Sequence, residues 1–177
     1  DVLVNNAGIA GPTGRIEDIK VEDWERCIAV DLNSLFYCTR LAMPMIKAAG
    51  GGSIISLSSA AGRLGFPLRS PYAAAKWGVV GFTASLAIEA GQDGVRVNCI
   101  QPGVVAGDRI DRVAAAKAEA FGVTTEEMKQ RMVEKVSMRT MVSAQDIANM
   151  ALFLASDAGR HISGQALSVC GNVETLA

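Results

Sequence analysis

Short apolar runs rich in valine and isoleucine alternate along this chain with longer segments of helical period. The apolar runs are Val2 to Val4, Ser53 to Leu57, Val95 to Ile100 and Ala166 to Val169. Helical patterns cover residues 22–49, 71–90 and 144–156, and a further helical region covers 108–136. Alternating strands and helices are typical of a parallel sheet with helices on both faces. We therefore expect one α/β domain with a doubly wound parallel sheet.

Composition narrows the function classes. Seventeen Lys and Arg stand against eighteen Asp and Glu, so there is no basic surplus for nucleic-acid phosphates. No uncharged apolar run approaches the ~18 residues of a membrane span. The single histidine, His161, argues against Ser-His-Asp hydrolysis and metal catalysis. The four cysteines are widely spaced, which predicts reduced thiols in a cytoplasmic protein without a bound metal: Cys27, Cys38, Cys99 and Cys170.

The segment 104–142 is unusually long for a connection between a strand and the next helix, where two to six residues usually suffice. In sheets of this kind, ligands bind beyond the carboxyl ends of the strands. The segment is therefore predicted to be a substrate loop or lid inserted in the domain. Taken singly, its four methionines are better explained by ordinary helix packing: Met128, Met132, Met138 and Met141.

The sharpest local motif is Tyr72-Ala73-Ala74-Ala75-Lys76. On a helix, positions i and i+4 lie on one face, so the phenol and the ammonium project together. A lysine cation held beside a tyrosine favours the phenolate, which makes the tyrosine usable as a general acid and base. Taken alone, the same spacing is also consistent with a helix that carries an ordinary surface lysine.

Four further motifs surround this pair: Asn5-Asn6-Ala7-Gly8 after the first strand, Asp31-Leu32-Asn33-Ser34 in the first long helix, Ser58-Ser59-Ala60-Ala61-Gly62 after the second strand, and Gln101-Pro102-Gly103 after the third. In this order and spacing, the motifs closely resemble those of the short-chain dehydrogenase/reductase family, over the whole chain. The resemblance implies a Rossmann-like fold and an enzyme that interconverts a secondary alcohol and a ketone with NAD or NADP.

The resemblance also implies a role for each catalytic residue. Tyr72 would exchange a proton with the carbonyl oxygen, and Ser59 would hydrogen-bond the same oxygen. Lys76 would favour the Tyr72 phenolate and bind the ribose hydroxyls of the cofactor. Asn33 would interrupt its helix and hold a water that links Lys76 to solvent, although a polar residue in mid-helix can also have no such role.

Cofactor contacts are implied at both ends of the site. Asn6, Ala7 and Gly8 would line the cofactor, where a glycine lets the backbone approach closely. Pro102, Gly103 and Val105 would pack on the nicotinamide end. The simpler interpretations are that the asparagines satisfy backbone groups at a strand end and that Pro102-Gly103 is only a turn.

The glycine-rich phosphate loop of the family is not found in this chain, whose first strand corresponds to the family's fourth. We therefore expect residues 1–177 to be a single incomplete domain, truncated at its N-terminus by about ninety residues, or three strand–helix units. Such a chain would leave one sheet face uncovered and one edge unpaired, and it would bind cofactor poorly and be inactive alone. Gly107, where the family usually has threonine, and Cys170-Gly171-Asn172, where it has Asp-Gly-Gly, are smaller departures.

The substrate is less constrained. The long segment after Pro102-Gly103 resembles that of 3-hydroxybutyrate dehydrogenases, and Arg69 is a candidate carboxylate partner, with Arg63 or Arg109 adding charge. Ala61 and Ala10, however, stand where that group has histidine and glutamine. Oxoacyl thioesters, sugars or polyols, and cyclic alcohols remain open.

The sequence also bears on two alternative functions and on an oligomeric state. The chain is consistent with a catalytically inactive family member that acts as a scaffold or subunit partner, although the intact motifs argue against it. A nucleotide-sugar epimerase would need a larger C-terminal region. The helices at 22–49 and 71–90 have more than one apolar face, which favours the homotetramer that is common in this family.

Overall fold

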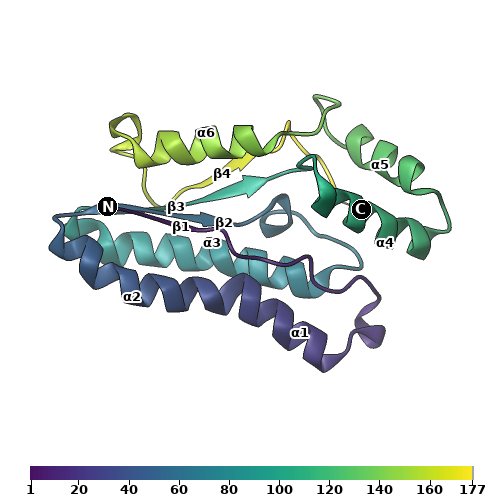
Figure 1. Cartoon of the computed structure of the whole chain (residues 1–177), viewed down its shortest axis with the longest axis horizontal. Helices are drawn as coiled ribbons and strands as arrows, with labels where there is room; N and C mark the ends of the chain where they lie inside the picture. The colour runs from purple at the N-terminus through teal and green to yellow at the C-terminus, as the bar shows by residue number, and fades with distance from the viewer. Residues whose placement is uncertain (177) are drawn as a thin grey trace.

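The computed structural model describes residues 1–176, which form a parallel four-stranded sheet in the order β1-β2-β3-β4. The strands are β1 (Val2–Asn5), β2 (Gly52–Leu57), β3 (Val95–Pro102) and β4 (Ala166–Val169). All three neighbouring pairs are parallel, so the carboxyl ends of the strands meet at one edge of the sheet. The predicted doubly wound α/β architecture is confirmed (Figure 1).

Helices cover both faces of the sheet (Figure 1). One face packs on α2 (Ser34–Ala48) and α3 (Ser70–Ala90), with α1 (Val21–Ile28) lying against α3, and the other face packs on α6 (Ala144–Ala155). Successive residues of β2 point to opposite faces. Ile54 therefore packs with Ile46 of α2, while Ile55 packs with Leu154 of α6.

The expected helix at 22–49 is interrupted by a π-helical turn, Ala29–Asn33, that separates α1 from α2. The expected helical region at 108–136 consists of two helices, α4 (Asp108–Phe121) and α5 (Thr125–Glu134). Gly122 joins them in a left-handed conformation with φ 65°. Thr124 and Ser143 begin α5 and α6 with capping boxes, the start signal that their S/T-x-x-D/E spacing indicates.

Within residues 1–176, the edge strand β1 pairs with β2 alone, and Val2 and Val4 are about half exposed. Leu3, between them, packs on the core under α2, whereas α6 packs on β2, β3 and β4. The apolar side chains of Val2 and Val4 therefore face solvent. Within residues 1–176, no helix combines the length and the apolar character needed to cross a membrane.

Candidate active site

A cavity of about 880 Å³ opens at the carboxyl edge of the sheet, between the strand ends and α4. The lining includes most of the residues that the sequence motifs single out: Asn6, Gly8, Ser59, Arg69, Tyr72, Lys76, Pro102, Gly103, Val105 and Arg109. In α/β sheets, this edge is the usual place for ligands. Of the predicted catalytic and cofactor-binding residues within the described part of the chain, Ala7 and Asn33 are the two that do not line this cavity.

Tyr72 and Lys76 lie one turn apart near the start of α3, which begins at Ser70 with Pro71 in its first turn. The Lys76 Nζ lies 5.5 Å from the centroid of the Tyr72 ring. Lys76 is buried, and its ammonium donates a hydrogen bond to the carbonyl oxygen of Leu57 at 3.0 Å. The helical spacing thus brings the two groups to the same wall of the cavity.

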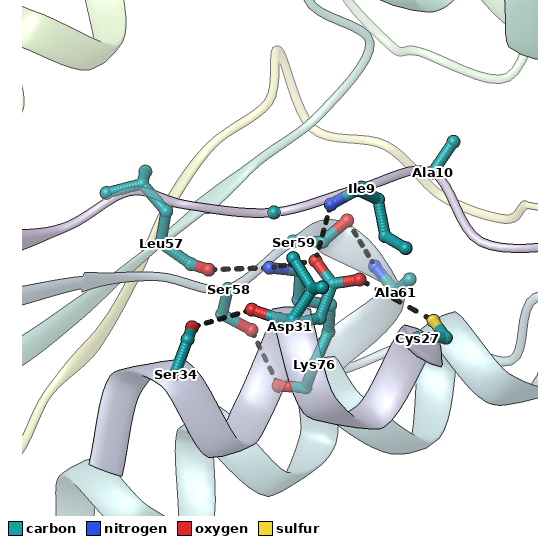
Figure 2. Close-up of polar contacts among 12 residues, drawn as sticks. Ile9, Ala10, Cys27, Asp31, Ser34, Leu57, Ser58, Ser59, Ala61 and Lys76 are labelled. Carbon is teal, nitrogen blue, oxygen red and sulfur yellow. Dashed lines mark hydrogen bonds and ion pairs between the residues drawn. The ribbon is translucent and has the colours of Figure 1, made fainter. Parts of the chain in front are cut away.

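Asp31, which sequence reasoning did not select, lies at the centre of this region (Figure 2). Its buried carboxylate is 3.3 Å from Lys76 Nζ and accepts a hydrogen bond from Ile9 N at 3.1 Å. It also accepts one from the Cys27 thiol at 3.5 Å. Burial, helped by the Asp31 charge, raises the pKa of Cys27 to about 12, so this cysteine remains a thiol. The signal in the sequence was an acidic residue in mid-helix, where aspartate is unfavourable.

Ser59 follows the end of β2 and caps the short 3₁₀ turn Ala60–Gly62, with its Oγ accepting a hydrogen bond from Ala61 N at 3.1 Å. The neighbouring Ser58 Oγ donates to the Lys76 carbonyl oxygen at 2.8 Å, which ties this turn to α3 (Figure 2). A Cβ at Gly62 would lie 2.3 Å from Ser58 Oγ. The close approach of the turn to α3 therefore requires glycine at this position.

Asn33 is the last residue of the π-helical turn and is half-buried. The expected interruption of the helix at this residue is present. Within residues 1–176, Lys76 Nζ has Asp31 and Leu57 as its hydrogen-bond and ion-pair partners and is not directly bonded to Asn33.

The loop after β1 and the segment after β3 form opposite parts of the cavity. A Cβ at Gly8 would lie 2.6 Å from the Asp31 carboxylate, so only glycine allows the loop to pass so close. After Gly103, Val105 pairs with Val142 in a short parallel bridge. This bridge joins both ends of the segment 104–142, and the α4–α5 hairpin projects from it beside the cavity (Figure 1).

Two arginines face Tyr72. The Arg69 guanidinium lies 5.1 Å from the Tyr72 ring centroid and donates to the Ala10 carbonyl oxygen, while its Nε is buried without a partner. Arg69 is only 2% exposed, and burial lowers its pKa. Arg109, at 5.8 Å from the same ring, donates to the Ile9 carbonyl oxygen at 2.7 Å.

Arg63, the other arginine considered for substrate charge, lies elsewhere. Its guanidinium donates to the Val173 carbonyl oxygen at 3.1 Å and to Cys170 Sγ at 3.4 Å, so it holds the C-terminal segment and is not among the cavity residues within 1–176. The cationic character of the cavity therefore comes from Arg69, Lys76 and Arg109.

Comparisons with known proteins match almost the whole chain. Residues 1–172 match the family model described as enoyl-(acyl carrier protein) reductase. The chain is 38% identical to a D-beta-hydroxybutyrate dehydrogenase of Rhizobium meliloti over 97% of its length, and 40% identical to a trans-4-hydroxycyclohexanecarboxylate dehydrogenase of Sinomonas cyclohexanicum over 97%. It spans 66% and 59% of these two relatives, less than two thirds of each.

Solved structures match the chain in both sequence and fold. Sorbitol-6-phosphate 2-dehydrogenase from Erwinia amylovora is 31% identical, with a TM-score of 0.92 over 97% of this chain and 68% of that one. An actinorhodin polyketide ketoreductase variant with NADPH is also 31% identical, with a TM-score of 0.93 over 98% of this chain and 67% of that one. The match of sequence, fold and site arrangement shows that the chain belongs to the short-chain dehydrogenase/reductase family.

Proposed function

We propose that the protein containing this chain is an NAD(P)-dependent oxidoreductase that interconverts a secondary alcohol and a ketone. The observation that carries the proposal is the Tyr72–Lys76 pair on one face of α3, with both side chains lining the 880 Å³ cavity. Relatives named as dehydrogenases of hydroxy acids and a related ketoreductase solved with NADPH support it.

The residues at the cavity fit the nicotinamide half of such a cofactor. Asn6 and Lys76 supply polar donors, and Pro102 and Val105 supply apolar surface on which a ring can pack. The Lys76 ammonium has three N–H donors, of which Asp31 and Leu57 engage two, so one is left for a ribose hydroxyl. The bound nicotinamide supplies the hydride chemistry.

The protein's own part in the reaction is to orient the substrate and to move one proton. Tyr72 donates its phenolic proton to the carbonyl oxygen during reduction and accepts it back during oxidation. Ser59 hydrogen-bonds the same oxygen and holds it toward Tyr72. The Lys76 cation stabilises the phenolate, and Asn33 holds the water through which the proton is replaced from solvent.

We propose that the substrate carries an anionic group near its carbonyl or carbinol carbon. Among residues 1–176, the buried guanidinium of Arg69 has no carboxylate partner, and an uncompensated buried cation is costly unless a ligand neutralises it. Arg109 adds a second cation above the Tyr72 ring. The hydroxy-acid relatives act on carboxylates by name, although Ala61 and Ala10 depart from the hydroxybutyrate pattern.

The remaining features belong to the same proposal. Segment 104–142 acts as a substrate lid on one domain spanning 1–177, because Arg109 at the start of α4 reaches back to the loop after β1. Two exposed apolar helix faces, on α2 and α3, support a homotetramer. The four unpaired cysteines support a cytoplasmic location.

The test replaces Tyr72 by phenylalanine in the protein that contains this chain. Removing the proton donor should lower kcat for ketone reduction about 10²–10⁴-fold while circular dichroism and NADPH binding stay unchanged. Tyr37→Phe is the matched control, because Tyr37 is the only other tyrosine and is exposed on α2. Unaltered hydride transfer in Tyr72→Phe would contradict the proposal, and unaltered function in the cell would favour the scaffold alternative.

A further inference from the structure

A second, smaller cavity of about 110 Å³ lies beside the active-site cavity, under α4 and α5. The two cavities share four lining residues, Phe66, Val104, Met132 and Leu176, so they adjoin one another. The rest of the smaller cavity's lining consists of three cationic side chains, Lys117, Arg131 and Lys135, together with Phe121, Met128, Val173 and Thr175. None of its lining residues within 1–176 is acidic. We call it the Lys117 cavity.

Lys117 is the most constrained of the three cations. It is 5% exposed, and its ammonium donates one hydrogen bond, to the Leu176 carbonyl oxygen at 3.2 Å. It also lies 4.7 Å from the centroid of the Phe66 ring. Burial and the nearby positive charges of Lys135 and Arg69 lower the pKa of Lys117 to about 8. Among residues 1–176, this buried ammonium has two donors without a hydrogen-bond partner and no counter-ion, which is the arrangement of a site prepared for an anion.

The Phe66 ring connects this cation with the active site. Arg69 lies 5.1 Å from its centroid, and Lys117 lies 4.7 Å from the same centroid. The positive charge of Arg131 contributes to lowering the pKa of Glu127, but the Glu127 carboxylate already accepts a hydrogen bond from Thr124 N. The structure therefore presents two separate cationic positions, one beside Tyr72 and one beyond Phe66, with apolar surface between them.

We propose that the Lys117 cavity binds a second anionic group, a carboxylate or a phosphate, at the far end of the same substrate. The inference rests on the proposed function, because it deepens the assignment of an anionic substrate held by Arg69. It selects substrates with two anionic groups joined by a short apolar chain over those with one.

The test follows the Lys117 ammonium directly, by NMR of the protein labelled with ¹³C at the lysine Cε atoms. Without ligand, Lys117 should titrate with a pKa of about 8. Saturating adipate, whose two carboxylates are separated by four methylenes, should raise this pKa by at least about one unit because an anion now faces the ammonium. Butyrate, with one carboxylate, should raise it much less at the same concentration.

Variants then assign the effect to the cavity. Lys117→Met should weaken adipate binding about tenfold, the loss expected for a charge-assisted hydrogen bond. Lys20→Met is the control, because Lys20 is an exposed lysine before α1. Unchanged adipate binding in Lys117→Met, or an ordinary Lys117 pKa without ligand, would overturn the proposal.

Inorganic phosphate distinguishes a free anion from a substrate group. If phosphate raised the Lys117 pKa as much as adipate, and Arg69→Met left both effects unchanged, the cavity would bind a free anion and the proposal would be wrong. The titration involves no turnover. A protein that binds adipate through Lys117 and Arg69 but transfers no hydride would contradict the proposed oxidoreductase function and not this site.

Discussion

Asp31 shows how much of the site depends on a single side chain. Its carboxylate fixes the loop after β1 through Ile9 N and neutralises the ammonium of Lys76 from α3. Without that charge, Lys76 would be a buried cation with only the Leu57 carbonyl oxygen as partner. Asp31 therefore acts as a positioning residue, because it holds the lysine against the Tyr72 wall of the cavity.

We predict that Asp31→Asn lowers the free energy of unfolding by about 3 kcal/mol, since breaking a buried ion pair leaves an uncompensated charge. The matched control is Asp93→Asn, because Asp93 pairs with Lys47 at 2.5 Å with both side chains 41% exposed. That substitution should cost less than about 1 kcal/mol. Urea unfolding of both variants measures the difference, and equal losses would contradict the role given to Asp31.

Lys117 makes stability depend on pH. Its pKa is about 8 in the folded protein against an ordinary value of 10.5. Below pH 8 the ammonium is charged in both states and the folded state bears the cost of burying it. Between about pH 8 and 10.5 the folded state loses this proton first, so the unfolded state binds more protons and stability rises with pH.

We therefore predict that Lys117→Met is stabilising relative to the unaltered protein near pH 7, and that its advantage shrinks as pH rises toward 10. Cys27 and Cys99 work in the opposite direction, because burial raises their pKa values to about 12 and 11. Both cysteines are present in Lys117→Met and in the unaltered protein, so their contributions to the pH dependence cancel when the two stabilities are subtracted. Urea unfolding at a series of pH values measures the difference in free energy of unfolding between the two proteins. A difference that does not change with pH would refute the prediction.

The residues that the sequence could predict are those whose chemistry depends on local spacing. Tyr72 and Lys76 share a helix, so their common face follows from helical geometry alone. The Asp31–Lys76 pair could not be predicted in this way, because it joins two different helices and depends on how they pack. Lys117 lies in the alanine-rich run Ala114 to Ala118, where nothing local distinguishes it from a surface lysine.

At the scale of elements, short sequence motifs predict where some helices begin. The capping boxes at Thr124 and Ser143 mark where α5 and α6 begin. The helical region 108–136 contains two helices, because Gly122 ends α4 and the start signal at Thr124 opens α5. Helical periodicity continues on both sides of such a turn, so periodicity alone does not reveal it.

We predict that Gly122→Ala destabilises the α4–α5 hairpin. Gly122 has φ 65°, and a Cβ there would meet nothing within 4 Å, so the cost is purely conformational. An alanine in this conformation costs about 1 kcal/mol. Gly65→Ala is the control, because Gly65 also has open space around it but no positive φ, and alanine there should be neutral or slightly stabilising.

Hydrogen exchange of the α4–α5 amides measures the effect of Gly122→Ala on the hairpin, and urea unfolding measures its effect on the whole chain. Faster exchange confined to α4 and α5 is the expected result. If Gly122→Ala and Gly65→Ala behaved alike, the left-handed turn would not limit the stability of the hairpin, and the joint between α4 and α5 would have to be sought elsewhere.

At the scale of the whole molecule, the apolar surface is concentrated on the outer sides of α2 and α3. Leu41 and Met45 on α2 are 68% and 74% exposed, and Ile88 on α3 is 82% exposed. Each helix already packs on the sheet through its other side, through residues such as Ile46 and Val79. Exposed apolar side chains on a helix that already packs on a sheet favour a protein interface on the outer side, and a second copy of the chain is the partner that the family resemblance favours.

We predict that the protein containing this chain is a tetramer and that Leu41→Glu dissociates it, because burying an unpaired carboxylate at an interface is unfavourable. Ile16→Glu is the matched control, since Ile16 is 65% exposed but lies before α1, outside these helices. Sedimentation velocity measures the assembly of both variants. Smaller species in Leu41→Glu alone would support the α2–α3 interface. A tetramer that survives this substitution would place the subunit contact on another face, and a monomeric unaltered protein would refute the assembly itself.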